Sequence, residues 1–195
     1  MHTLTQLRQW CQDKNIPSIS PETEQIISQI LQTIRPKYCC EIWAAAGYSS
    51  TMIANTIQAR GWQIYSFEVA HNAYTWSLTH TKPITNLTIY PRSPLDINLD
   101  TLLPKKYDFV FIDGQKAQYN QYLMKIQSLL HKESVIVCDD VIKFQNKLTP
   151  LYWYLQKMQI FYEILRTEVD DGIMLIGEKS LIKAIVDRIK SKNKK

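Results

Sequence analysis

Three carboxylates in the second half of the chain have the type and the spacing that a metal-dependent reaction needs. Asp113 follows the apolar run YDFVFI, and Asp139 and Asp140 follow the apolar run SVIVC. Both runs are too short for helices and are typical of buried strands, so the three acids should crowd one edge of a sheet. A hard divalent cation would relieve their repulsion, and oxygen ligands favour magnesium, calcium or manganese over zinc. The alternative is that each aspartate caps a following helix.

Lys116 adds a group that could move a proton. It lies three residues after Asp113, so both side chains can reach the same edge if a helix starts near Gly114. A lysine close to a divalent cation is pushed toward its neutral form, which would make Lys116 a general base. The other interpretation is a surface lysine that pairs with Asp113 across one turn, and the spacing leaves both open.

The stretch EIWAAAGYSS, residues 41–50, has the form of a nucleotide-binding turn with one unusual position. Glu41 ends an apolar segment and Gly47 opens a helix, but bulky Trp43 stands where a glycine is expected. Glu68 ends the next apolar run, about 20 residues beyond the turn, where an acid can accept hydrogen bonds from ribose hydroxyls. A solvated strand-end carboxylate is the alternative for Glu68. The GxGxxG and GK[ST] motifs are absent from the sequence, which disfavours a dinucleotide or a triphosphate.

Alternating strands and helices would bring these residues together. Ser20 caps a helix that continues with Pro21 and stops at Pro36. Further helices are expected over residues 48–59, 74–81, 118–130, 149–159 and 180–192, and strands over residues 38–43, 63–69, 86–90, 107–114, 134–140, 161–167 and 172–178. This order predicts an α/β fold, a doubly wound Rossmann-like sheet that is mostly parallel and has a terminal antiparallel hairpin. Ligands of such sheets bind beyond the carboxyl ends of the strands, which selects the acids above and the region of Ser93.

Length and composition fit a single domain over residues 1–195, with residues 1–37 as an N-terminal helical segment and residues 179–195 as a C-terminal helix and basic tail. No segment has the length and hydropathy of a membrane span or a secretion signal, so a cytoplasmic protein is expected. The four cysteines show no metal-ligand spacing and are expected to be reduced and mostly buried. The basic tail, residues 179–195, holds 7 basic and 1 acidic residue and accounts for all of the net charge of +5, so the body of the chain is close to neutral.

With these residues in place, the chain resembles the metal-dependent class I O-methyltransferases that use S-adenosylmethionine, the group of catechol and caffeoyl-coenzyme A methyltransferases and their bacterial relatives. The resemblance covers most of the chain. Residues 16–31 look like the family's first helix, EIWAAAGYSS like its first cofactor motif, FIDGQKAQY like its metal and lysine motif, VCDDVI like its second metal motif, and VDDGIMLIGEK like its terminal hairpin. The most specific of these is FIDGQKAQY.

The resemblance implies a role for each matching residue. Glu68 would hold the ribose of S-adenosylmethionine and Ser93 would lie beside its adenine. The methionine part would lie along Glu41, Gly47, Tyr48 and Ser49, and the other cofactor contacts expected are Trp43 and Asp113. A magnesium ion, or manganese or calcium, would be bound by Asp113, Asp139 and Asp140. Lys116 would take the proton from the acceptor hydroxyl beside Asp113, since a metal-bound hydroxyl ionises more easily and methyl transfer then depends mostly on alignment.

Three positions depart from the family pattern. Trp43 replaces a glycine, Pro94 removes a backbone donor beside the expected adenine site, and Asp140 replaces an asparagine. The added charge of Asp140 should tighten the binding of a divalent ion. An indole at position 43 could fill the space in which a glycine lets the backbone approach the ligand; alternatively, the side chain turns into the core or toward solvent.

The predicted function is a metal-dependent O-methyltransferase that acts on a small phenol, a vicinal diol or a hydroxylated nucleoside. A variant is a tRNA methyltransferase in which the basic tail tracks phosphates. A different class is a catalytically inactive binding module whose cofactor pocket is filled by Trp43. A homodimer is expected from the resemblance, and a membrane partner is not.

Overall fold

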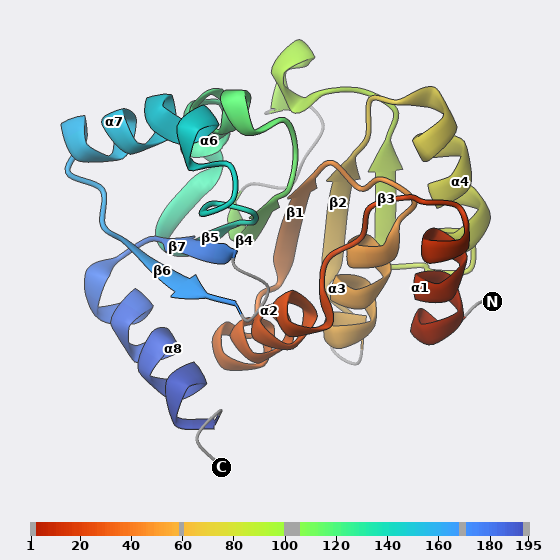
Figure 1. Cartoon of the computed structure of the whole chain (residues 1–195), viewed down its shortest axis with the longest axis horizontal. Helices are drawn as coiled ribbons and strands as arrows, with labels where there is room; N and C mark the ends of the chain where they lie inside the picture. Colours follow the sequence, from red (N-terminus) through yellow and green to blue (C-terminus); the bar gives the residue numbers. More distant parts are fainter. Residues whose placement is uncertain (1–2, 59–60, 100–105, 168–170, 193–195) are drawn as a thin grey trace.

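The computed structural model describes residues 3–58, 61–99, 106–167 and 171–192. Its strands form one sheet in the order β3-β2-β1-β4-β5-β7-β6 (Figure 1). The strands are β1 (Tyr38–Ile42), β2 (Gln63–Phe67), β3 (Leu87–Tyr90), β4 (Tyr107–Ile112), β5 (Leu130–Cys138), β6 (Tyr162–Arg166) and β7 (Gly172–Ile176). The α-helices are α1 (Leu4–Asp13), α2 (Pro21–Ile34), α3 (Tyr48–Gln58), α4 (His71–Thr81), α6 (Tyr119–Ile126), α7 (Thr149–Lys157) and α8 (Lys179–Lys192).

The pairing of the strands confirms the predicted fold class. Strands β1 to β5 pair in parallel, whereas β7 pairs antiparallel with both β5 and β6. The strand order reverses between β1 and β4, which is the place where a doubly wound sheet binds its ligand. The predicted terminal hairpin is formed by β6 and β7, and residues 168–170 of its turn lie outside the described residues.

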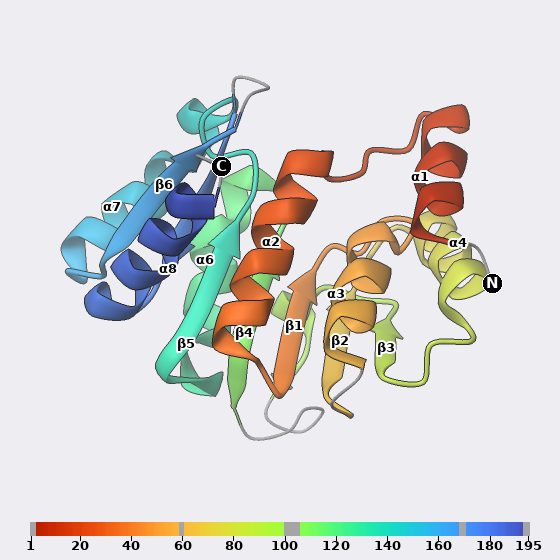
Figure 2. The same ribbon diagram turned by 90° about the horizontal axis from the view of Figure 1, so that it is seen from below.

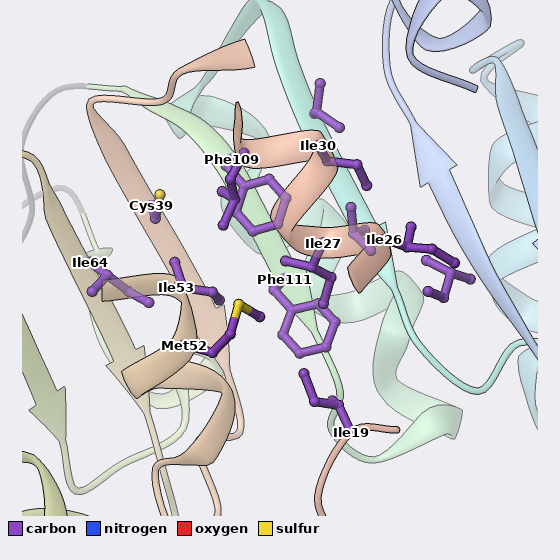
Figure 3. Close-up of a cluster of buried hydrophobic side chains, with 14 of the residues drawn as sticks. Ile19, Ile26, Ile27, Ile30, Cys39, Met52, Ile53, Ile64, Phe109 and Phe111 are labelled. Carbon is purple, nitrogen blue, oxygen red and sulfur yellow. The ribbon is translucent and has the colours of Figure 1, made fainter. Parts of the chain in front are cut away.

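Side chains alternate between the two faces of the sheet and build an apolar core on each. In β1, Cys39 belongs to the cluster that includes α2, α3 and α8, whereas Cys40 belongs to the cluster that includes α6 and α7. Figure 2 shows α2, α3 and α8 on one side of the sheet and α6 and α7 on the other. Phe109 and Phe111 of β4 face the first cluster, where Figure 3 shows them beside Ile27. Burial on both faces explains why these strands are almost continuously apolar.

The start of α2 fixes the segment that precedes it. The Ser20 hydroxyl accepts a hydrogen bond from the Thr23 amide at 3.0 Å, and Pro21 occupies the first helical position, as predicted. Residues 17–20 therefore reach the carboxyl ends of the strands in a defined conformation. The four cysteines are free and buried, as expected. Within the described residues, no helix is both long and apolar enough to cross a membrane.

Candidate active site

A cavity of about 960 Å³ opens at the carboxyl ends of the central strands. Its walls come from five segments: the chain leading into α2, the turn after β1, the turn after β4, the segment after β5, and Thr167 and Asp171 of the β6–β7 hairpin. Among the sequence-predicted site residues, those that line it are Trp43, Tyr48, Ser49, Asp113, Lys116, Asp139 and Asp140. The strand-end rule thus locates the cavity correctly and brings most of the candidate residues together.

The charged part of the cavity is organised around Lys116. Its Nζ atom donates to Asp113 Oδ1 at 2.8 Å and lies 2.9 Å from Asp140 Oδ2. The same ammonium donates to the Tyr119 hydroxyl at 2.8 Å, and this hydroxyl donates to the carbonyl of Asp139 at 3.1 Å. Tyr119 is the first residue of α6 and is fully buried, so its hydroxyl fixes the position of the Lys116 ammonium relative to this helix. Short bonds between charged groups are stronger than neutral ones, so this cluster is rigid.

The electrostatics of the cluster differ from those expected next to a divalent cation. Burial lowers the pKa of Lys116, but the carboxylates of Asp113 and Asp140 raise it by more, so the ammonium form is favoured. Burial raises the pKa of Asp139, and the charges of Asp113 and Asp140 raise it further. Lys116 is therefore a hydrogen-bonded cation between two carboxylates.

The predicted metal ligands do not form a metal centre in this arrangement. Across the described residues, no group of three or more histidine, cysteine, aspartate or glutamate side chains is placed to hold an ion. The ammonium of Lys116 lies between Asp113 and Asp140, where it offsets their charge itself. The aspartates therefore surround a lysine cation, and a divalent ion would bind there only if this ammonium moved.

The turn after β1 is where the structure answers the question raised by Trp43. This residue has φ of 78°, a left-handed conformation that glycine adopts without strain and tryptophan rarely adopts. Its indole Nε1 donates to the Tyr122 hydroxyl at 2.9 Å, and a Cβ atom on Gly114 would lie 2.2 Å from Trp43 Cδ1. The side chain thus turns from β1 across Gly114 toward α6, and it forms part of the cavity wall.

Glu41 lies behind this wall, among buried side chains. One of its oxygens accepts hydrogen bonds from the hydroxyls of Ser50 and Ser66, and the other is buried with no hydrogen-bond partner among the described residues. Burial raises the pKa of Glu41 to about 7, against an ordinary value of 4.5. Glu41 is therefore part of the support beneath the cofactor turn, and it does not line the cavity.

The other expected cofactor residues are also engaged within the fold. The Glu68 carboxylate accepts from the amides of Ala45 at 2.8 Å and Ala70 at 2.7 Å, and it is buried. Ser93 accepts from the Leu95 amide at 3.1 Å and caps a single 3₁₀ turn, Pro94–Asp96. Neither Glu68 nor Ser93 lines the cavity, and Gly47 supplies the sharp turn into α3 with φ of 86°.

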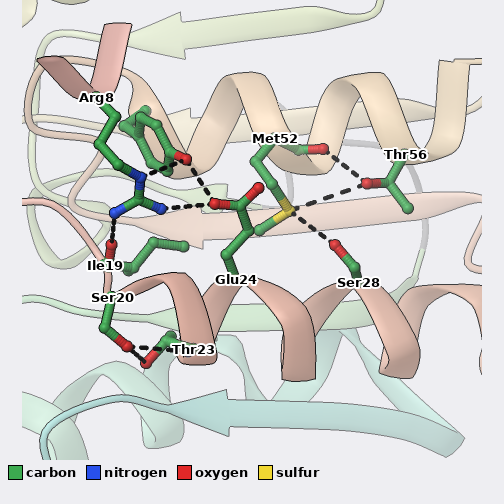
Figure 4. A network of polar contacts seen from close by, with 9 residues as sticks. Arg8, Ile19, Ser20, Thr23, Glu24, Ser28, Met52 and Thr56 are labelled. Carbon is green, nitrogen blue, oxygen red and sulfur yellow. Dashed lines mark hydrogen bonds and ion pairs between the residues drawn. The ribbon is translucent and has the colours of Figure 1, made fainter. Parts of the chain in front are cut away.

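Tyr48 belongs to a hydrogen-bond network beside the cavity that was not predicted from the sequence. Its hydroxyl donates to Glu24 Oε2 at 2.5 Å and accepts from Arg8 Nε at 3.0 Å. Arg8 also donates to Glu24 at 2.6 Å and to the carbonyl of Ile19 at 2.7 Å (Figure 4). The network ties α1, α2 and α3 together and fixes residues 17–20 against the cavity. No motif marks Arg8, because its partners are distant in sequence.

The sheet topology and the strand-end cavity define a Rossmann-like methyltransferase fold. The chain matches the family model described as O-methyltransferase over residues 1–176, and it belongs to this family. Two solved structures with the same fold are the O-methyltransferase from Bacillus cereus in complex with SAH (TM-score 0.78, 18% identity, 90% of each chain covered) and TomG from Streptomyces achromogenes in complex with SAM (TM-score 0.76, 16% identity, 90% of this chain and 88% of that chain covered).

Curated relatives include two plant caffeoyl-CoA O-methyltransferases. The protein from Stellaria longipes is 28% identical over 130 residues, which cover 63% of this chain and 54% of the relative. The protein from Medicago sativa is 24% identical over 166 residues, which cover 82% of this chain and 67% of the relative. The match thus spans about half the length of the first relative and two thirds of the second. The resemblance seen in the sequence motifs is confirmed at the level of the family.

Proposed function

We propose that this chain transfers a methyl group from S-adenosylmethionine to a hydroxyl group of a small acceptor. The observation that carries the proposal is the Lys116 ammonium, which Asp113 and Asp140 hold at the wall of a strand-end cavity in a chain of the O-methyltransferase family. The relatives and neighbours named above support the same donor and the same class of reaction. A volume of about 960 Å³ suits a cofactor together with a small acceptor.

Lys116 and Asp113 are the proposed catalytic pair. When bound, S-adenosylmethionine supplies an electrophilic methyl group on a positively charged sulfur. The carboxylate of Asp113 would take the proton of the acceptor hydroxyl as that oxygen bonds to the methyl carbon and the bond from this carbon to sulfur breaks, and the Lys116 ammonium would stabilise the negative charge that develops on the oxygen. The Tyr119 hydroxyl holds Lys116, and Lys116 in turn holds Asp113, so little reorganisation is needed when the acceptor arrives.

The methionine end of the cofactor fits the wall formed by the turn after β1 and the start of α3. Tyr48 and Ser49 line the cavity at the first turn of this 11-residue helix. The free amides and the positive end of the helix dipole at such a turn favour a carboxylate ligand. Residues 44–46 present only methyl groups to the cavity and leave room for the ligand.

The described part of the basic tail lies away from the cavity. Helix α8 packs against β6, and its last described turn lies beside the end of β6 and the start of α2, where Ile189 and Lys190 are close to Arg166 and Glu22. Because none of the described residues of α8 lines the cavity, the helix gives no specific support to a tRNA acceptor. A small molecule is the acceptor that the cavity favours.

Binding of the cofactor tests the proposal directly. A ligand at 100 times its dissociation constant should stabilise the folded chain by about 2.7 kcal/mol, which thermal unfolding with S-adenosylmethionine or S-adenosylhomocysteine would detect. Methyl transfer to catechol and to caffeic acid, followed by mass spectrometry, would then establish the reaction. No stabilisation by either compound at millimolar concentration would overturn the proposal and favour the inactive binding module.

A further inference from the structure

We propose that Trp43 sets the affinity for the cofactor by closing the adenosyl end of its site, and that the indole must turn away from Gly114 when the cofactor binds. This inference rests on the proposed function. It follows from the strand order, from the conformation of the turn after β1, and from the contacts that hold the indole.

The strand order places Trp43 between two parts of the expected site. Strand β1 lies between β2 and β4, and Trp43 is the first residue after it. The cavity is lined by residues that follow β1, β4 and β5, whereas Glu68, which follows β2, is outside it. A cofactor that contacts the charged cluster and extends its ribose toward the acid after β2 must therefore pass over the end of β1. The Trp43 side chain lines the cavity beside the end of β1, with its indole against Gly114 and Tyr122.

The backbone directs the indole to this position. The amides of Trp43 and Ala44 both donate to the Phe67 carbonyl, at 2.8 and 3.0 Å, which ties the turn to the end of β2. With φ fixed at 78°, the side chain leaves the turn toward β4. A non-glycine residue in a sparsely populated backbone region costs about 1–3 kcal/mol and persists only when its surroundings enforce it. The indole is thus held in place by contacts elsewhere.

Gly114 and Tyr122 provide those contacts. The absence of a side chain at Gly114 creates the space for the ring, since a Cβ atom there would lie 2.2 Å from Cδ1 and 2.5 Å from Nε1 of Trp43. The Tyr122 hydroxyl accepts the indole N–H at 2.9 Å and donates to Gln118 Oε1 at 2.6 Å. Large and small residues are therefore complementary across the end of the sheet, and one hydrogen bond fixes the ring.

Glu68 is consistent with a closed site. Both of its oxygens are occupied by backbone amides, from Ala45 and Ala70, and the Ala45 amide belongs to the same turn as Trp43. Movement of this turn would release the indole and one carboxylate oxygen together. A site that is open only part of the time binds with an affinity reduced by the open fraction, so residues that stabilise the closed form weaken binding.

Calorimetric titration with S-adenosylhomocysteine tests this inference on four chains. Trp43→Gly should bind at least about tenfold more tightly than the natural chain, because the closed form no longer competes. Tyr122→Phe retains the ring of residue 122 and loses its hydrogen bonds to the indole and to Gln118, so it should bind about threefold more tightly. Trp153→Phe changes a side chain that is 60% exposed on α7 and should bind as the natural chain does.

Tryptophan fluorescence gives an independent readout of the movement. S-adenosylhomocysteine should change the emission of the natural chain and leave that of Trp43→Phe nearly unchanged. The inference would be overturned, and the proposed function left intact, by either of two results. One is equal affinity of the natural chain, Trp43→Gly and Tyr122→Phe for S-adenosylhomocysteine; the other is an emission change that persists in Trp43→Phe. If only Trp43→Gly bound S-adenosylhomocysteine, the indole would block the cofactor site permanently, and the proposal that the indole moves on binding would be refuted. Absence of binding in all four chains would overturn the inference and the proposed function together.

Discussion

Two parts of the sheet edge at the carboxyl ends of the strands differ in where their polar side chains point and what they bind. After β4 and β5, charged side chains face the cavity, and Lys116 is held there by Asp113 and Asp140. After β1 and β2, the expected ligand groups are taken up by the fold: Glu68 accepts backbone amides and the Trp43 indole fills the space above Gly114. The first may be called the charged side and the second the closed side.

The difference separates chemistry from cofactor binding. The charged side needs its residues to meet within hydrogen-bonding distance, and the structure shows that they do. A cofactor on the closed side would need empty space over the end of β1. In this chain an aromatic residue, Trp43, stands directly after β1. Under the proposed function, the catalytic groups are preorganised while the affinity for the cofactor is set separately, by the position of the Trp43 ring.

Substitution of Lys116 should have the largest effect, because it removes the centre of the charged side. Lys116→Met leaves Asp113 and Asp140 without their cation, and loss of a positioned proton-transfer or charge-stabilising group should lower kcat at least about 100-fold. Steady-state kinetics with S-adenosylmethionine and catechol would measure this. Lys116→Arg is the matched control for charge without the same geometry. A loss of less than threefold in Lys116→Met would show that the chemistry lies elsewhere.

Glu41 provides a test of the closed side through the pH dependence of stability. Burial raises its pKa from 4.5 to about 7, so the folded chain keeps a proton that the unfolded chain has released. This contribution to the free energy of unfolding is present below pH 4.5 and is lost as the pH rises to about 7. From the size of the shift, the loss amounts to about 3 kcal/mol.

Glu41→Gln should remove this contribution, since glutamine does not titrate. Urea unfolding at pH 5 and pH 7.5 would show a steeper loss of stability in the natural chain than in the variant. Equal losses would mean that Glu41 is ionised in the folded chain, and that a cation or solvent reaches the region beneath the cofactor turn. Because the comparison uses the difference between two chains, the other acids contribute equally to both.

Removal of metal ions should have the smallest effect, and it tests whether the charged side is complete. Since the Lys116 ammonium already lies between Asp113 and Asp140, EDTA should lower methyl transfer by less than about threefold. A loss of more than tenfold that magnesium restores would show that Lys116 moves aside and that Asp113, Asp139 and Asp140 bind the ion that the family resemblance implies.

The fold and the charged side could be predicted from sequence because their signals are local. Apolar runs that end in acids marked β4 and β5, Ser20 with Pro21 marked the start of α2, and the strand-end rule placed Asp113 beside Asp139 and Asp140. Each of these inferences depends on residues within a few positions of one another. The parallel sheet then brings the separate signals together.

The closed side could not be predicted, because it depends on contacts between distant segments. Trp43 was an evident departure, but its direction depends on Gly114, which is 71 positions away, and on Tyr122, which is 79 positions away. A glycine directly after Asp113 is the only sequence signal, and it has meaning only once β1 and β4 are known to be neighbours. Arg8 was missed for the same reason, since the residues it contacts come from α2, α3 and the segment between α1 and α2.

The hydrogen bonds of Arg8 also bear on how substitutions could change the cavity during evolution. The wall formed by residues 17–20 is joined to the site through side chains and a helix cap, whereas the catalytic groups lie at strand ends fixed by backbone hydrogen bonds. Substitutions in this wall can therefore reshape the acceptor cavity without displacing Lys116 or its aspartates. Under the proposed function, residues 17–20 are thus positions at which substitutions would change the acceptor while the reaction chemistry is retained.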